Sequence, residues 1–285
     1  MKPRSLQHGA APRWDVVQPV RRVRPNGVSI TGFRNQGAGA IDLPLIPYPA
    51  ITVILECGDG SLTVNGGTDR SQRGSLVSGL HTGAMRMSGT NIECVEVRLS
   101  PVVAYRVLGV PLVEMAGGVV PADAVWGRAA DRVRQQLGDA PTWDDRFAAT
   151  EALLTRHGRD RPSVDREVAW AWDQLIVSRG GLRVEHLAES IGWSRKRLWS
   201  RFRSQIGLPP KHAVRLFRFS HAAQGLAAGD NAAQVAADCG FADQSHLHRE
   251  VLAFTGMTPT SLAGAPELVL EDTTRAEGTF VQDPR

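Results

Sequence analysis

The first half of the chain alternates short runs rich in β-branched residues with glycine-rich turns. The clearest runs are residues 51–55, 61–64 and 94–99, and the turn Asn65-Gly66-Gly67 follows one of them. Such runs between turn signals are typical of strands. Residues 29–99 are therefore predicted to form an antiparallel sheet or a small barrel.

From Ala122 to about Arg156 the apolar spacing becomes helical. Val125, Ala129, Val133 and Leu137 would share one helix face, and Phe147, Leu153 and Leu154 mark a second helix. A charged segment with Gly158 and Pro162 follows and is predicted to be a linker. The predicted domains are 14–157 and 163–264, with residues 1–13 and 265–285 as flexible tails.

Two stretches of the second half repeat one pattern of apolar and turn residues. The first copy contains Leu187-Ala188, Ile191-Gly192-Trp193, Ser194, Leu198, Phe202, Gly207-Leu208 and Pro210. The second contains Val235-Ala236, Cys239-Gly240-Phe241, Asp243, Leu247, Val251, Gly256-Met257 and Pro259. The offset is 48 residues up to the aromatic and 49 afterwards, so Ala242 is an extra residue in the second turn.

Each element of the repeat has a physical reason. A glycine between two helices adopts a positive φ at little steric cost, and Ser194 or Asp243 can accept from the amides that open the next helix. Leu198 with Phe202, and Leu247 with Val251, form apolar i, i+4 stripes that hold this helix against the preceding one. The pattern predicts two helix-turn-helix units.

The opposite stripe of each second helix carries side chains suited to base edges and phosphates. The predicted DNA-binding residues are Ser194, Arg195, Lys196, Arg197, Trp199, Ser200, Arg203, Gln244, Ser245, His246, His248 and Arg249. For His246 and His248, packing is the alternative to DNA contact, and metal ligation is disfavoured because residues two apart on a helix point to different faces.

Charge strengthens this interpretation. Between Glu189 and Asp230 the chain has eight basic residues and no acidic one, and the run includes the first predicted recognition helix. An ordinary cationic surface is the alternative, but the coincidence favours phosphate binding. The basic residues are Arg195, Lys196, Arg197, Arg201, Arg203, Lys211, Arg215 and Arg218.

Taken together, these motifs resemble the DNA-binding domain of the AraC/XylS transcription regulators over residues 163–264. The resemblance implies that a long helix, here about 210–227, joins two units that enter successive major grooves about 34 Å apart. Two positions depart from the family pattern. Position 201 is Arg where an apolar residue is commoner, and position 251 is Val where Phe is commoner. Looser packing is expected at both.

The N-terminal half resembles the cupin-like sensor domains of the same family, through Val97-Arg98-Leu99-Ser100-Pro101, Tyr105, Leu108-Gly109-Val110-Pro111 and Val119-Val120-Pro121. The implied fold class is α+β with two domains: a cupin-like β-barrel with following helices, which in such regulators often mediate dimerisation, and an all-α domain with two helix-turn-helix units. Fold follows from such a resemblance, but the ligand does not.

Composition agrees with a DNA-binding protein of two domains. The chain has 285 residues, 42% hydrophobic and 22% charged, with a net charge of +4 and a pI near 9.3. No apolar run approaches a membrane span and no leader is evident, so we expect a cytoplasmic protein. Cys57, Cys94 and Cys239 show no metal spacing and are expected to be reduced and buried.

Catalysis is not expected. A cupin metal site needs clustered histidines, and His81 is the only histidine between residues 9 and 156. The Gly58-Asp59-Gly60 segment lacks the context of a phosphate loop, and we assign no catalytic, metal or cofactor residue. A cupin-type enzyme fused to a DNA-binding domain and a thiol sensor using Cys57 or Cys94 remain alternatives.

The sequence thus predicts a sequence-specific transcription regulator, either activator or repressor, that binds two adjacent major-groove segments of double-stranded DNA. The expected partners are a second copy in a homodimer, a small-molecule effector, and RNA polymerase if the chain activates. No membrane partner is expected.

Overall fold

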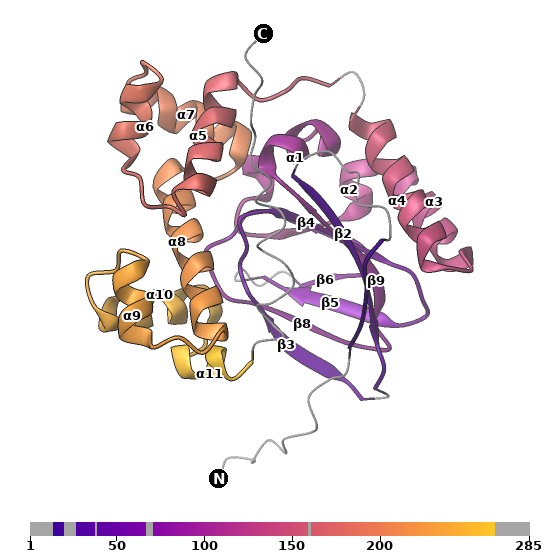
Figure 1. Ribbon diagram of the computed structural model, residues 1–285. Coiled ribbons are helices and arrows are strands. Elements are labelled where there is room, and N and C mark those ends of the chain that lie inside the picture. The colour runs from indigo at the N-terminus through magenta and orange to yellow at the C-terminus, as the bar shows by residue number, and fades with distance from the viewer. Residues whose placement is uncertain (1–13, 20–26, 38, 67–70, 159–160, 266–285) are drawn as a thin grey trace.

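The computed structural model describes residues 14–19, 27–37, 39–66, 71–158 and 161–265 (Figure 1). The predicted tails lie outside these residues, except Ala265. The chain is α+β, with an N-terminal region rich in antiparallel strands and a C-terminal helical region. The exact domain limits, 14–157 and 163–264, remain a prediction.

The strands form two antiparallel sheets. One has six strands in the order β1-β2-β9-β4-β7-β10, and the other has four in the order β3-β8-β5-β6. The three predicted runs are strands β4, β5 and β9, which confirms the β-rich interpretation. The bounds are β1 Trp14–Val17, β2 Val28–Asn35, β3 Ile41–Leu45, β4 Ile51–Glu56, β5 Ser61–Asn65, β6 Ser71–Arg73, β7 Leu76–Ser78, β8 Met85–Thr90, β9 Glu93–Leu99 and β10 Val119–Pro121.

Strand alternation builds a core on each face of the six-stranded sheet. Between the sheets, Leu62, Val64 and Met85 pack with Ile54 of the facing sheet. On the other face, side chains such as Val53 belong to a second core under helices α1–α4. This second core continues into the helical region.

Helices α1 Pro101–Leu108, α2 Ala122–Trp126, α3 Arg128–Asp139 and α4 Trp143–Gly158 cover that outer face, with the 3-10 helix η1 Leu112–Met115 between α1 and β10. The helix expected from Ala122 to Leu137 is broken at Gly127, which has φ 53° and ends α2. The expectation of one continuous helix was therefore wrong. The sequence concealed the break because the spacing of apolar residues continues unchanged across Gly127.

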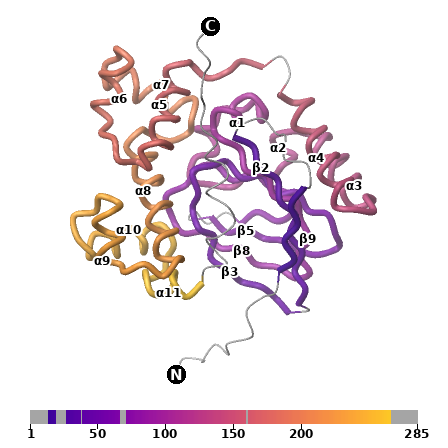
Figure 2. The backbone as a smooth tube through the Cα atoms, viewed as in Figure 1, coloured from indigo at the N-terminus to yellow at the C-terminus, as the bar shows by residue number. Residues whose placement is uncertain are grey.

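The C-terminal region is entirely helical among its described residues. Its long helix α8 has the bounds predicted from sequence and runs from the first helix-turn-helix unit to the second (Figure 2). The bounds are α5 Arg166–Val177, α6 Val184–Ser190, α7 Arg195–Ile206, α8 Pro210–Ala227, α9 Ala232–Asp238, α10 Gln244–Thr255 and α11 Pro259–Ala263.

Aromatic side chains of α8 anchor both units. Phe217 lies 4.9 Å from the buried Trp172 of α5, measured between ring centroids. Phe219 stacks on Phe254 of α10 with centroids 4.4 Å apart and planes 5° from parallel. One rigid helix therefore carries the two units.

The β-rich region touches the end of each recognition helix. Helix α7 packs on η1 and α1, and a methyl group added at Gly207, which follows α7, would lie 2.9 Å from the carbonyl oxygen of Leu112. Gly256 is the equivalent glycine after α10. A methyl group added there would lie 3.6 Å from the Cβ atom of Ala84. The first of these contacts is much tighter.

Candidate nucleic-acid interface

The two predicted turns share one geometry. Gly192 and Gly240 have φ of 68° and 69°, the left-handed conformation that glycine adopts without strain. Ser194 accepts a hydrogen bond from the amide of Arg197 at 3.2 Å, and Asp243 accepts from the amide of His246 at 2.6 Å. Both N-caps predicted from sequence are therefore formed.

The apolar stripes of both second helices are buried as predicted. Leu198, Phe202, Leu247 and Val251 have no exposed surface. The preceding helices contribute Leu187 with Ala188 and Val235 with Ala236, all at most 4% exposed. Each unit therefore holds its second helix by one face and leaves the other free.

That free face carries the predicted DNA-binding residues. Those of α7 and its cap are all exposed, and those of α10 are exposed except His246, which is half-buried. The side chain of Trp199 is on the surface with 47% of its area exposed, so it does not belong to the core. Whether each residue contacts DNA remains a prediction.

Two arginines of α7 stack on tryptophans at this surface. The guanidinium of Arg197 lies 4.4 Å from the ring centroid of Trp193, and that of Arg203 lies 5.2 Å from Trp199. Stacking leaves guanidinium N–H groups free to donate while it restricts the side chain. The pairs are therefore suited to binding phosphate or base edges.

The basic run divides into two groups. Arg201, Arg215 and Arg218 are used inside the domain: the first two bind carboxylates, and the third lies 4.7 Å from the ring centroid of Phe241. The remaining five are exposed: Arg195, Lys196, Arg197, Arg203 and Lys211. Arg195 also lies 3.5 Å from the carboxylate of Glu185, but both of these side chains are more than half exposed. Only these five fit the phosphate-binding interpretation.

Arg201 does not loosen the packing of α7. Its guanidinium binds the carboxylate of Asp165, the N-cap residue of α5, and holds the pKa of that carboxyl below its usual range. The carbonyl oxygen of the buried Gln205 side chain accepts a hydrogen bond from the Asp165 amide at 2.8 Å. The other departure, Val251, is completely buried.

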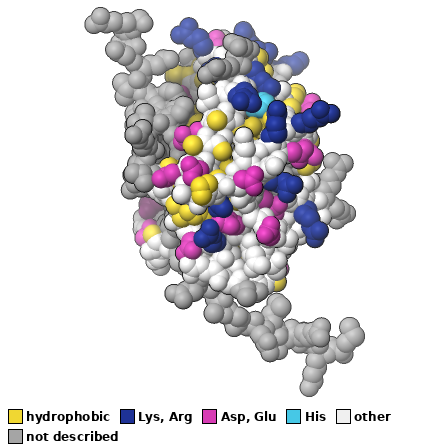
Figure 3. Space-filling view, turned by 90° about the vertical axis from the view of Figure 1, so that its right-hand side faces the viewer, with side chains coloured by type: hydrophobic (Ala, Val, Ile, Leu, Met, Phe, Trp, Pro, Cys, Tyr) yellow, Lys and Arg dark blue, Asp and Glu magenta, His cyan; other side chains and the backbone are white. Residues whose placement is uncertain are grey.

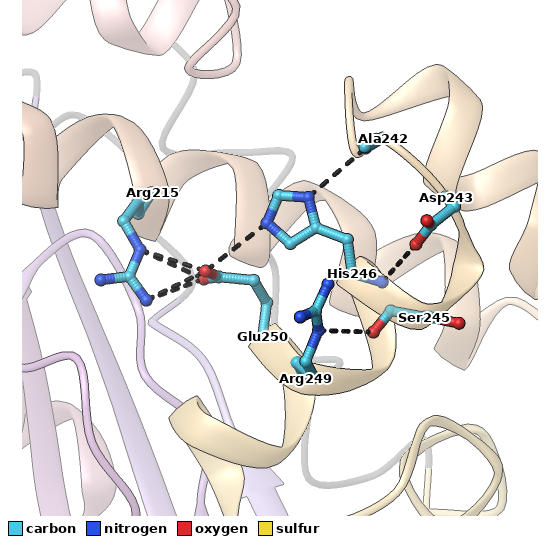
Figure 4. A network of polar contacts seen from close by, with 7 residues as sticks. All are labelled: Arg215, Ala242, Asp243, Ser245, His246, Arg249 and Glu250. Atoms are coloured by element: carbon cyan, nitrogen blue, oxygen red, sulfur yellow. Dashed lines mark hydrogen bonds and ion pairs between the residues drawn. The ribbon is translucent and has the colours of Figure 1, made fainter.

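The side chain of His246 lies along α10, between the turn that precedes this helix and the next helical turn. Its Nδ1 atom lies 3.4 Å from the amide nitrogen of Ala242, and its Nε2 atom lies 3.9 Å from a carboxylate oxygen of Glu250 (Figure 4). Arg249, by contrast, is exposed and donates to the carbonyl of Ser245 at 3.3 Å.

Two further exposed cations of the C-terminal region lie outside the residues predicted on the second helices and their caps. Arg183 is the N-cap residue of α6, and Lys211 lies in the first turn of α8. The signal that could have found Arg183 is a basic residue directly before the first helix of a helix-turn-helix unit. Amides at helix N-termini commonly bind phosphate, so a cation there reinforces the site.

The cysteines are free and buried, as expected. Burial raises the pKa of the Cys57 thiol to about 11 and that of the Cys239 thiol likewise to about 11, and it also raises the pKa of Cys94 well above its ordinary value. Cys57 and Cys94 belong to the cores on opposite faces of the six-stranded sheet. Among the described residues no cluster of His, Cys, Asp or Glu fits a metal ion, and no helix could span a membrane.

The match to a known family covers this same region. Residues 187–264 match the family described as "Helix-turn-helix domain". The C-terminal region is an AraC-type helix-turn-helix domain. The matched domain is a DNA-binding module.

Solved structures similar to this chain include three that share 10–19% of its sequence. ToxT from Vibrio cholerae is 10% identical with a TM-score of 0.46, over 84% of this chain and 98% of that chain. The C-terminal domain of AraT, a response regulator from Geobacillus stearothermophilus, is 19% identical with a TM-score of 0.34, over 36% and 87%. The AraC-like activator CuxR is 14% identical with a TM-score of 0.32, over 71% and 84%. No curated protein matches the chain.

Proposed function

We propose that the chain is a sequence-specific regulator whose helices α7 and α10 enter successive major grooves on one face of the DNA. The observation that carries this proposal is that the same helix-turn-helix unit, with a glycine in its turn and a capped second helix, occurs at both ends of α8. Helix α8 has 18 residues and so spans about 27 Å, at about 1.5 Å per residue. That length is comparable with the roughly 34 Å between successive major grooves on one face.

Chemical footprinting of the purified chain on sites found by genome-wide mapping tests this proposal. We expect two sets of protected guanine N7 atoms about 10 base pairs apart on one face of the duplex. A single protected set would mean that one unit alone reads DNA. Protection without sequence preference would contradict specific regulation.

The helical hairpin α3–α4 supports a homodimer. Among its exposed charges, Arg128, Arg132 and Arg156 outnumber Asp131 at one end, and Asp139, Asp144 and Asp145 lie at the other. Figure 3 shows this side of the molecule, with Lys and Arg crowded at the top and with Asp and Glu mixed with further Lys and Arg across the middle. An antiparallel pairing of two hairpins would place opposite charges together.

Charge reversal tests this pairing. Chains with Arg128→Glu and Arg132→Glu, or with Asp139→Arg and Asp144→Arg, should sediment as monomers. A mixture of the two should form a heterodimer, because the reversed ends become complementary. Dimers that persist in both separate variants would place the interface elsewhere.

Control by an effector would act through the contact between the β-rich region and α7. Because η1 and α1 pack on α7, and Gly207 at the end of α7 lies against Leu112 of η1, a shift of either element changes where the first recognition helix lies. An effector can shift this equilibrium only by binding one arrangement more tightly. The effector therefore belongs to the N-terminal region in this proposal.

A further inference from the structure

The extra residue of the second turn leaves an extra amide to be satisfied. In the first unit, Trp193 donates its amide back to Ala188 and the next residue is already the N-cap, Ser194. In the second unit, Phe241 donates to Ala236 in the same way, but Ala242 precedes the N-cap. The Ala242 amide donates to Nδ1 of His246 at 3.4 Å.

This contact assigns the tautomer of the neutral His246 ring. Because Nδ1 accepts, the neutral ring carries its proton on Nε2. The Nε2–H group faces the carboxylate of Glu250 at 3.9 Å, one helical turn further along α10. The ring also meets Phe241 edge-on, with centroids 5.3 Å apart and planes at 87°.

Glu250 is in turn fixed to α8. Both nitrogens Nε and Nη2 of Arg215 lie 3.0–3.3 Å from its two carboxylate oxygens, a bidentate geometry. The Glu250 side chain is only 14% exposed. Arg215 also lies 5.7 Å from the ring centroid of Phe254, beside the stacked pair that joins α8 to α10.

The chain of contacts therefore runs from the lengthened turn, through His246 and Glu250, to Arg215 of the helix that carries both units (Figure 4). We propose that His246, Glu250 and Arg215 are positioning residues that set the angle at which α10 meets DNA. In this proposal they determine which base pairs the second unit reads without touching those base pairs. The inference rests on the proposed function, because it assumes that α10 reads DNA.

Selection of binding sites from a random duplex library tests this inference with the full-length chain. The wild-type chain should select two blocks of preferred base pairs, one for each unit. In Glu250→Gln, Arg215→Gln and His246→Ala, we expect discrimination within one block to fall about tenfold, while the other block is retained. The exchanged pair, Arg215→Glu with Glu250→Arg, should restore part of the loss.

His246 has two informative conservative variants. Asn places an acceptor where Nδ1 lies, so His246→Asn should keep the bond from Ala242 and most of the discrimination. Gln places its amide near Nε2, so His246→Gln should behave like His246→Ala. Asp42→Asn is the matched control, since it breaks an exposed ion pair with Arg86 in the β-rich region and should change neither block.

The outcomes separate the two ideas. If the wild-type chain selects no sequence, the proposed function itself is contradicted. If His246→Ala changes a single base pair while Glu250→Gln and Arg215→Gln leave that block intact, His246 is a direct DNA contact and the inference is overturned. Loss of both blocks together in folded variants, checked by circular dichroism, would overturn it as well.

Discussion

The guanidinium of Arg201 donates two hydrogen bonds to the carboxylate of Asp165, at 2.6 Å and 2.7 Å. This pair joins the first recognition helix to the start of α5, directly after the predicted linker. It turns a residue within the basic run into a structural contact. Its strength can be measured through pH, since one partner titrates.

Asp165→Asn should remove part of the acid dependence of stability. The pKa of Asp165 is lowered in the folded chain, chiefly by the hydrogen bonds from Arg201, so the pair stabilises above the unfolded-state value and is lost as pH falls through the folded value. Because Arg201 is half exposed, the effect at pH 7 should be about 0.2–1 kcal/mol. Urea unfolding at about pH 7 and at about pH 3 measures this effect, because an ordinary aspartic acid carboxyl titrates near pH 4, between these two values.

In this experiment the variant should be less stable than the wild type at pH 7, and its deficit should be smaller at the acidic pH, because the contribution of the pair falls as pH drops below the unfolded pKa of the carboxyl. Asn is chosen because it retains the shape and the N-cap preference of Asp. An equal deficit at both values would mean that the loss comes from packing and not from charge.

Trp199→Ala and Lys196→Ala test direct reading by α7. Each variant should lose about 1–3 kcal/mol of binding free energy on the selected site and little on random DNA, because base contacts carry specificity. Trp170→Ala is the control, since Trp170 is an exposed tryptophan on α5 outside the recognition helices. Equal losses on both kinds of DNA would assign Trp199 and Lys196 to the phosphate backbone.

The salt dependence of binding tests the division of the basic run. Log affinity should fall linearly with log salt concentration, and Arg195→Ala or Arg203→Ala should lower the slope by about one for each phosphate that the variant no longer neutralises. Arg201→Ala is the matched control on the same helix, because its guanidinium is bound to Asp165 at 2.6 Å, whereas Arg195 lies 3.5 Å from the exposed Glu185. If Arg201→Ala lowered the slope as much as the others, total charge and not position would control binding.

Thiol reactivity tests the redox alternative. Burial raises the pKa of Cys57 to about 11, so only a small fraction of this thiol is thiolate at neutral pH, and burial also raises the pKa of Cys94 well above its ordinary value. We therefore expect slow labelling of both thiols and unchanged DNA binding after mild oxidation. A loss of binding that Cys57→Ala or Cys94→Ala prevents would favour the thiol sensor.

The local parts of the site could be predicted from sequence, and the long-range parts could not. Ser194, Asp243 and the two turn glycines act within a few residues of themselves, so their pattern is visible in the chain. Arg201 and Arg215 find partners 36 and 35 residues away, and nothing in the basic run distinguishes them from exposed arginines. The break at Gly127 was hidden because apolar residues continue the helical period across it.

Gly207→Ala and Gly256→Ala test the contact between the two regions. These glycines end the two recognition helices with φ of 97° and 70°, so alanine in the left-handed conformation costs about 1–2 kcal/mol at either position. Only at Gly207 would the new methyl group meet backbone, 2.9 Å from the Leu112 carbonyl oxygen, whereas Gly256 has ordinary contact with Ala84. Gly207→Ala should therefore lose more stability in urea and expose the predicted linker to protease sooner.

Gly192→Ala has a similar φ of 68° with nothing near its added methyl group, so it reports backbone strain alone. Equal losses in all three variants would mean that η1 yields easily to α7, and that the β-rich region does not fix the first recognition helix.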